Sequence, residues 1–224
     1  MKNDNTLFLL AAPRAAGKST LLNSGFDKLG TLLGPNLQNK LFETNVDQTG
    51  IDPKNFEELR KRSSYFSASN LKFLRAEKPA NRSYLIHVDT YNVLKNLSVN
   101  PDYLTSQQRN KLIKQGISLT RRLDFELLDK KSNDVLLKSF LEEPFFLEFG
   151  RLVNITLYCD HEKNQNQALE RNGKYLFGYP DPSANLIHSE LYDCWKRNMC
   201  NLKPFANFEI FQGPNGYEIF HSKS

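Results

Sequence analysis

Cysteine is scarce in this chain. The 224 residues contain only three, Cys159, Cys194 and Cys200. Their odd number, without Cys-x-x-Cys spacing or a matching pair of histidines, argues against a disulfide framework and against a zinc site. We therefore expect reduced, structural thiols, as in a cytosolic protein.

Long apolar runs are lacking as well. The polar start MKNDN precedes an apolar stretch that covers only residues 7–12. This stretch is too short for the core of a signal peptide or for a membrane span. The sequence predicts a soluble, cytoplasmic protein with no membrane span.

A dense block of positive charge is also missing. Thirty Lys and Arg residues against 25 Asp and Glu residues give a net charge of +5 and a pI near 9.0. This balance suits anionic ligands such as nucleotides, sulfated or phosphorylated compounds, or nucleic acid. Because the charge is spread along the chain, nucleic acid is disfavoured as the main partner.

Apolar segments alternate with helical ones along most of the chain. Residues 6–12, 83–88 and 152–159 have the apolar, β-branched or aromatic composition of buried strands. Strands separated by helices predict a mainly parallel sheet covered by helices. The helices are expected from Lys18 onward and over residues 53–76, 106–131, 133–141 and 184–202.

The C-terminal part has a different pattern. Residues 205–212 and 217–220 flank Gly213-Pro214-Asn215-Gly216, a turn-forming sequence, so we expect a terminal antiparallel hairpin or edge. Residues 36–50 carry few structural signals and are interpreted as a mobile or substrate-facing stretch. The fold class is α/β, in a single domain over residues 1–224.

One loop carries the chemistry. The first predicted strand is followed by a phosphate-binding pattern and then by a helix, and its residues are Ala12, Pro13, Arg14, Ala15, Ala16, Gly17, Lys18, Ser19 and Thr20. Backbone N–H groups of such a loop wrap a phosphate, and the helix N-terminus adds partial positive charge. Gly17 allows close approach, Lys18 reaches the phosphates, and the Ser19 hydroxyl is suited to Mg²⁺.

This loop resembles the Walker A motif of the P-loop NTPase superfamily, in a variant with alanine at the first glycine, and more loosely the small-molecule kinase branch. The resemblance implies a three-layer P-loop fold that binds ATP with Mg²⁺. It also implies that Gly17, Lys18, Ser19 and Thr20 contact phosphate and metal.

A carboxylate follows the second strand. Asp89 ends the run SYLIHV, which resembles a Walker B arrangement. Asp89 would hold Mg²⁺ together with Ser19, or act as a base toward a substrate hydroxyl. The alternative is an Asp that only caps the turn. His87 is interpreted as a core or surface histidine.

Phosphoryl transfer needs further cations, often from a mobile lid. Such a lid is expected within residues 160–174, where the candidates are Lys163, Arg171 and Lys174. Arg171 is our choice, so the predicted catalytic residues are Lys18, Asp89 and Arg171. In contrast, Arg121 and Arg122 are interpreted as a solvated helix face. Four residues of the last helix are expected in the core: Leu186, Ile187, Leu191 and Trp195.

Several signatures are lacking. The run Asp89-Thr90-Tyr91-Asn92 lacks the glycine of the Asp-x-x-Gly found in guanine-nucleotide switches. The sequence also has no Asn-Lys-x-Asp, no acidic pair after this strand like that of motor ATPases, and no Leu-Ser-Gly-Gly-Gln of transporter ATPases. The leading hypothesis is therefore a Mg²⁺-dependent phosphotransferase, a kinase, that acts on a small-molecule, glycan-type or nucleotide-type acceptor.

Two alternatives stay open. The segment from Ala11 to Arg14 also resembles the donor loop of sulfotransferases, which use a 3′-phosphoadenosine sulfonate donor. The longer spacing to Gly17 and the Lys18-Ser19 pair depart from that pattern. The other alternative is a non-catalytic nucleotide-binding scaffold. Neither the acceptor nor the oligomeric state can be derived from the sequence.

Overall fold

A five-stranded sheet with the order β2-β1-β3-β4-β5 organises the computed structural model, which describes residues 5–47, 83–99, 104–117, 129–180, 182–213 and 216–223. The first four strands are parallel, and β5 pairs antiparallel with β4. The strands are β1 (Thr6–Ala12), β2 (Tyr84–Asp89), β3 (Arg151–Tyr158), β4 (Ala206–Gly213) and β5 (Gly216–Lys223).

Helices lie between successive parallel strands along the chain, which is the usual connection for strands that run in the same direction. On the N-terminal side they are α1 (Lys18–Leu33), α2 (Pro35–Asp47), α5 (Thr90–Val99) and α6 (Ser106–Lys114). Further along they are α7 (Lys130–Leu141), α8 (Pro144–Leu147), α9 (His161–Asn172), the 3₁₀ turn η3 (Leu176–Gly178) and α10 (Ser183–Leu202).

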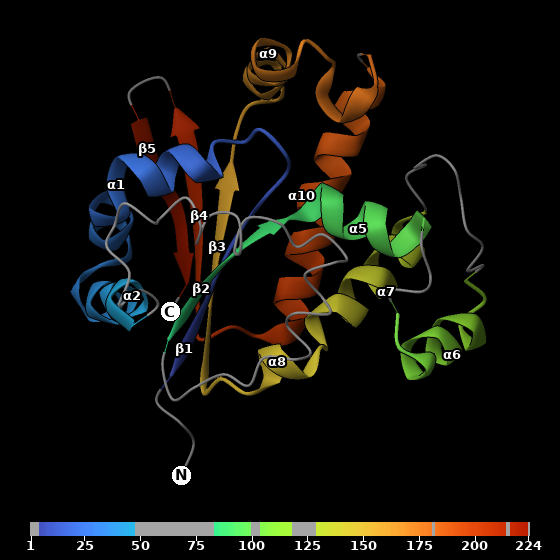
Figure 1. Cartoon of the computed structure of the whole chain (residues 1–224), viewed down its shortest axis with the longest axis horizontal. Helices are drawn as coiled ribbons and strands as arrows, with labels where there is room; N and C mark the ends of the chain where they lie inside the picture. Colours follow the sequence, from blue (N-terminus) through green and yellow to red (C-terminus); the bar gives the residue numbers. More distant parts are fainter. Residues whose placement is uncertain are drawn as a thin grey trace.

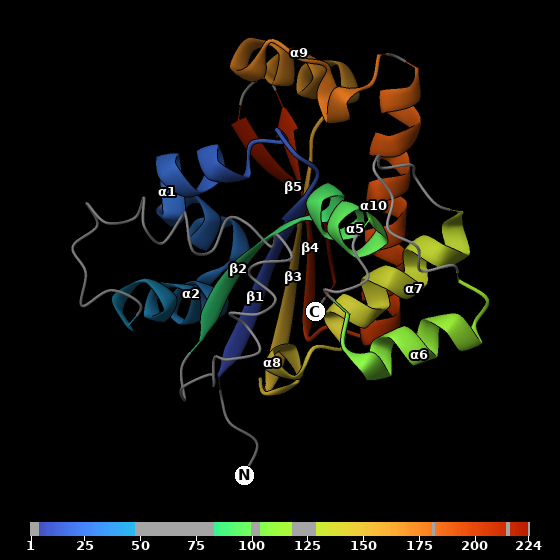
Figure 2. The same cartoon turned by 45° about the vertical axis from the view of Figure 1, so that its right-hand side comes forward.

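Both faces of the sheet are covered. Leu7 and Leu9 of β1 pack in one apolar cluster with side chains of α5, α7 and α10. Phe8 and Leu10 point to the other face and pack with α1 and α2. Figures 1 and 2 show these two groups of helices on opposite sides of the sheet. Burial on both faces explains why the run TLFLLAA has no polar alternation.

Helix α9 lies at the end of the sheet where the parallel strands finish. Figures 1 and 2 show it above the tip of β3 and beside the loop that leads into α1. The helix begins directly after Asp160, whose side chain accepts hydrogen bonds from the backbone N–H groups of Glu162 (2.9 Å) and Lys163 (3.3 Å). An Asp at this position is a favourable N-cap. This end of the sheet is where ligands of open α/β folds bind.

The expected strands and the α/β fold class are confirmed. Residues 6–12 form β1 as predicted, and β2, β3 and β4 differ from the predicted ranges by one residue. The terminal antiparallel hairpin is present as β4 and β5. Within the described part of the chain, no helix is both long and apolar enough to cross a membrane.

One predicted helix was wrong in its extent, and one helix was not predicted. Residues 106–131 do not form one helix, because α6 stops at Lys114 and Gly116 has a φ of 78°. A glycine in this left-handed conformation ends a helix. Residues 36–50 contain helix α2, which starts at Pro35, a residue favoured at the first helical position. The predicted helix over residues 53–76 lies outside the described residues, as do Arg121 and Arg122.

One predicted core position was also wrong. Ile187, Leu191 and Trp195 are buried in α10, but Leu186 is 70% exposed. The three buried side chains recur every four residues and share one stripe of the helix. Leu186 is one residue before Ile187, about 100° around the helix axis, so it points away from the core.

Candidate phosphate-binding cavity

The β1–α1 loop, residues 13–17, turns sharply twice. Ala15 has a φ of 61° and Gly17 a φ of 86°. For a residue with a side chain this left-handed conformation costs about 1–2 kcal/mol. Such strain collects at functional sites, because the surrounding structure must hold it in place. The two left-handed residues therefore give this loop a backbone conformation that an ordinary turn does not have.

The N-terminus of α1 lies beside this loop and has no side-chain cap. Gly17 is the N-cap residue, and the first turn of the helix has no acidic residue. The carbonyl oxygen of Gly17 accepts the first helical hydrogen bond, from Leu21 N at 2.9 Å. No side chain of this helix neutralises the partial positive charge at its N-terminus, and such a helix end favours binding of an anion.

Lys18 places its ammonium group beside the loop. Nζ donates to the carbonyl oxygens of Ala12 at 2.6 Å and Pro13 at 2.8 Å. Burial lowers the pKa of Lys18, and the nearby carboxylate of Asp89 acts in the opposite direction. Lys18 is thus a partly buried cation, and among the described residues that line the space around it Asp89 is the one carboxylate that balances its charge, which favours binding of an additional anion.

Asp89 ends β2 next to β1. It pairs with Ala12 in the parallel register and is 7% exposed. Its carboxylate accepts two hydrogen bonds from Asn92, from the backbone N at 3.1 Å and from Nδ2 at 3.0 Å. Asp89 therefore caps α5, and the same carboxylate faces a cavity. Asp89 thus both caps a helix and lines the cavity.

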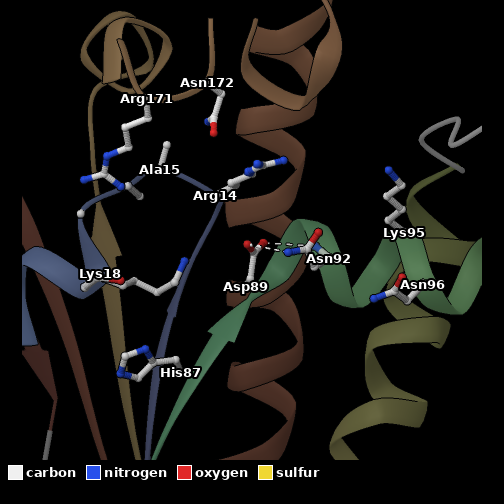
Figure 3. A pocket seen from close by; sticks show the side chains of 13 residues that line it. Arg14, Ala15, Lys18, His87, Asp89, Asn92, Lys95, Asn96, Arg171 and Asn172 are labelled. Atoms are coloured by element: carbon white, nitrogen blue, oxygen red, sulfur yellow. Dashed lines mark hydrogen bonds between the residues drawn. The ribbon is translucent and has the colours of Figure 1, made fainter. Parts of the chain in front are cut away.

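A cavity of about 620 Å³ lies between these groups (Figure 3). Its volume is in the range of ligand sites. The described residues that line it come from the β1–α1 loop and the start of α1, from β2 and α5, and from α9: Arg14, Ala15, Ala16, Gly17, Lys18, Ser19, His87, Asp89, Asn92, Lys95, Asn96, Arg171 and Asn172.

Charge dominates this lining. Four of the side chains are cationic, and Asp89 is the single carboxylate among the described residues that line the cavity. His87 adds no charge at neutral pH, because burial, with the nearby Lys18 as the second cause, lowers its pKa to about 3. The site therefore suits a polyanion.

The predicted site residues are distributed as follows. Lys18, Asp89 and Arg171 line one cavity, and so do Ser19 and most of the loop. Ala12 and Pro13 contribute their carbonyl oxygens to Lys18, while the Thr20 side chain is exposed and lies outside the lining. For the described residues, no group of three or more His, Cys, Asp and Glu side chains forms a metal cluster.

The segment expected as a lid is a helix attached to the loop. Asn164 of α9 is fully buried, and its amide, in the orientation that satisfies its neighbours, donates to the carbonyl oxygens of Arg14 (3.0 Å) and Ala15 (3.1 Å). Its oxygen then accepts from His188 Nε2 at 3.3 Å. Burial lowers the pKa of His188 to about 4, so this histidine is neutral.

The three candidate cations of this segment have different surroundings. Arg171 extends from the end of α9 into the cavity (Figure 3). Lys163 instead donates to the carbonyl oxygens of Gln212 and Gly213, both at 3.3 Å. Lys174 is exposed and does not line the cavity. The helix thus directs Arg171 alone of the three to the cavity.

Sequence reasoning missed part of the lining. His87 was interpreted as a core or surface residue, and it is buried but faces the cavity. Asn92, Lys95 and Asn96 of α5 were not singled out. Their spacing, three and four residues after Asn92, is the one signal that could have placed them on a shared helix face beside Asp89.

Comparison of the chain with protein-family models, with curated proteins and with solved structures found no match.

Proposed function

We propose that the cavity binds ATP with Mg²⁺ by its phosphates, as the P-loop resemblance implies, and that the protein transfers a phosphoryl group to a small acceptor. The observation that carries this proposal is the convergence of Lys18, Asp89 and Arg171 on the strained loop before α1. Phosphoryl transfer depends mainly on positioned positive charge, and Lys18 and Arg171 supply it.

The residues fit a magnesium ion. Mg²⁺ keeps several water molecules and is held by one or two protein oxygens together with substrate phosphates, so a cage of three protein ligands is not required. The hydroxyl of Ser19 and the carboxylate of Asp89 line the same cavity and are the two oxygen donors we assign to it. When bound, the ion neutralises charge on the phosphates.

The transfer step is assigned to this chain's own groups. An acceptor hydroxyl oxygen forms a bond to the γ-phosphorus, the bond from phosphorus to the β–γ bridging oxygen breaks, and ADP leaves with that electron pair. The hydroxyl proton is released to solvent, while Asp89 stays with the magnesium ion. Lys18 and Arg171 stabilise the negative charge on the phosphoryl oxygens.

A sulfonate transfer is the second candidate, because Arg14, the residue shared with the donor loop of sulfotransferases, lines the same cavity. Asp89 is the reason for preferring phosphoryl transfer, since sulfonate transfer has no metal for it to hold. Thermal denaturation separates the two. A larger rise in melting temperature with adenosine 3′,5′-bisphosphate than with ADP would favour the sulfonate donor, because a ligand stabilises the fold that binds it.

Calorimetric titration with Mg²⁺ and ATP tests the binding part. We expect Lys18→Ala to weaken binding by about 10- to 150-fold, since a charge-assisted hydrogen bond is worth about 1.5–3 kcal/mol. Lys28→Ala removes an exposed lysine from the same helix and serves as the matched control. Equal affinity of Lys18→Ala and wild type would refute nucleotide binding at this loop. ATP binding without ADP release for any acceptor would favour the non-catalytic scaffold.

A further inference from the structure

The side of the cavity farther from the loop is formed by one face of α5. Asn92, Lys95 and Asn96 line the cavity, and their spacing places them on one side of the helix. The buried side chains of Val93, Leu94 and Leu97 belong to the apolar cluster beneath. Helix α5 therefore presents a polar face to the cavity while its apolar side packs into the core.

This polar face and the loop lie on opposite sides of Asp89. In Figure 3 the ammonium of Lys18 points toward Asp89 from one side, and Asn92 contacts Asp89 from the other. Lys95 and Asn96 lie beyond Asn92, farther along α5. A molecule bound against α5 would therefore meet the phosphates of a nucleotide at Asp89.

Charge balance indicates what kind of molecule this is. Four cationic side chains and one carboxylate leave the described lining with three net positive charges. A nucleoside triphosphate with one magnesium ion carries roughly two negative charges. Among the described lining residues, Lys95 is the cation on the α5 side, where it also lies over the ring of Tyr91 at 5.7 Å, and an ammonium at this place favours an anionic group on the bound molecule.

The side chains of the lining also argue against a bound molecule with an aromatic base on the α5 side. No Phe, Tyr or Trp is present among the described residues that line the cavity, and its only apolar side chains are Ala15 and Ala16. A planar base needs an aromatic or apolar wall to stack against. The α5 side offers two amides and an ammonium instead, which match hydroxyl groups and an anion.

We propose that the α5 face binds the acceptor, and that the acceptor is a hydroxylated, non-aromatic small molecule with its own anionic group, such as a phosphorylated polyol. Lys95 pairs with the anionic group, Asn92 and Asn96 bind hydroxyls, and one hydroxyl lies at Asp89. This assignment rests on the proposed function, because the loop must hold the nucleotide for the acceptor to be aligned.

The test uses protein already loaded with Mg²⁺ and a non-hydrolysable ATP analogue, so that the loop is occupied. Calorimetric titration of this complex with glycerol 3-phosphate should show binding, and glycerol should bind at least about tenfold more weakly. Lys95→Ala should weaken glycerol 3-phosphate binding by about tenfold or more and leave the affinity for the ATP analogue within about twofold. Lys114→Ala, an exposed lysine on α6, is the control and should change neither.

The outcomes separate the two proposals. Failure of the ATP analogue to bind wild type would overturn the proposed function. Normal analogue binding with no glycerol 3-phosphate binding, with equal binding of glycerol, or with an unchanged affinity in Lys95→Ala would overturn the acceptor assignment alone. Circular dichroism of Lys95→Ala checks that the variant is folded, and Lys95→Arg should restore binding, because it keeps the charge.

Discussion

Replacing Gly17 by alanine tests the construction of the loop. Gly17 has a φ of 86°, and a Cβ atom there would lie 2.8 Å from Oε1 and 2.9 Å from Nε2 of Gln212. The left-handed conformation costs alanine about 1–2 kcal/mol. Displacement of the Gln212 side chain adds about 1 kcal/mol, the low end of the cost of overpacking, because this side chain is flexible. We expect the free energy of unfolding to fall by about 2–3 kcal/mol.

Gly173 provides a matched control for this prediction. It ends α9 with a φ of 61°, and a Cβ atom there would meet no other atom within 4 Å. Gly173→Ala should therefore show the conformational cost alone. The difference between the two variants, about 1 kcal/mol, corresponds to roughly 2–4 °C in melting temperature for a chain of this size.

Chemical and thermal denaturation of both variants measure the effect. Combining Gly17→Ala with Gln212→Ala should recover the packing part and leave the conformational part, which a double-mutant cycle isolates. Equal destabilisation by Gly17→Ala and Gly173→Ala, with no coupling between positions 17 and 212, would refute the reasoning. We also expect Gly17→Ala to weaken ATP binding, because the strained backbone would shift at the N-terminus of α1, where we propose that the phosphates bind.

Two further predictions concern the groups around the loop. Asn164→Leu removes a fully buried amide that donates to the carbonyl oxygens of Arg14 and Ala15, so the free energy of unfolding measured by thermal denaturation should fall by about 2–4 kcal/mol; an unchanged melting temperature would contradict the attachment of α9 to the loop. Phosphate binding needs protonated Lys18, whose pKa is lowered by burial. ATP affinity should therefore fall as pH rises, starting below the ordinary lysine value of about 10.4, and titrations of Lys18→Arg should show a flat profile over the same range.

Local pattern was sufficient to predict the strands. Residues 6–12 and 83–88 are short apolar runs bounded by polar residues, and they form neighbouring strands of the sheet. Burial of both faces leaves few residue types that fit, so the pattern is strong. Helix lengths were less predictable, because the end of α6 depends on the backbone conformation of Gly116 rather than on hydrophobic periodicity.

The lining of the cavity was predictable only in part. Lys18 and Ser19 belong to a local motif, and Asp89 ends a strand, so their chemistry could be derived from residues near them in the chain. Asn164 contacts the loop from about 150 residues away, and no local signal marks it. His87 is distinguished from an ordinary buried histidine only by the space that it faces.

The sequence by itself therefore determined the α/β class, the loop before α1 and the positions of the residues suited to phosphate, because these depend on short-range spacing and on the polarity of each segment. Only the tertiary structure decided which distant side chains share the cavity. Parallel pairing brings Asp89 beside Ala12, and the packing of α5 and α9 brings Lys95 and Arg171 to the same space. Contacts between segments depend on how whole elements pack, and that information is not local in the chain.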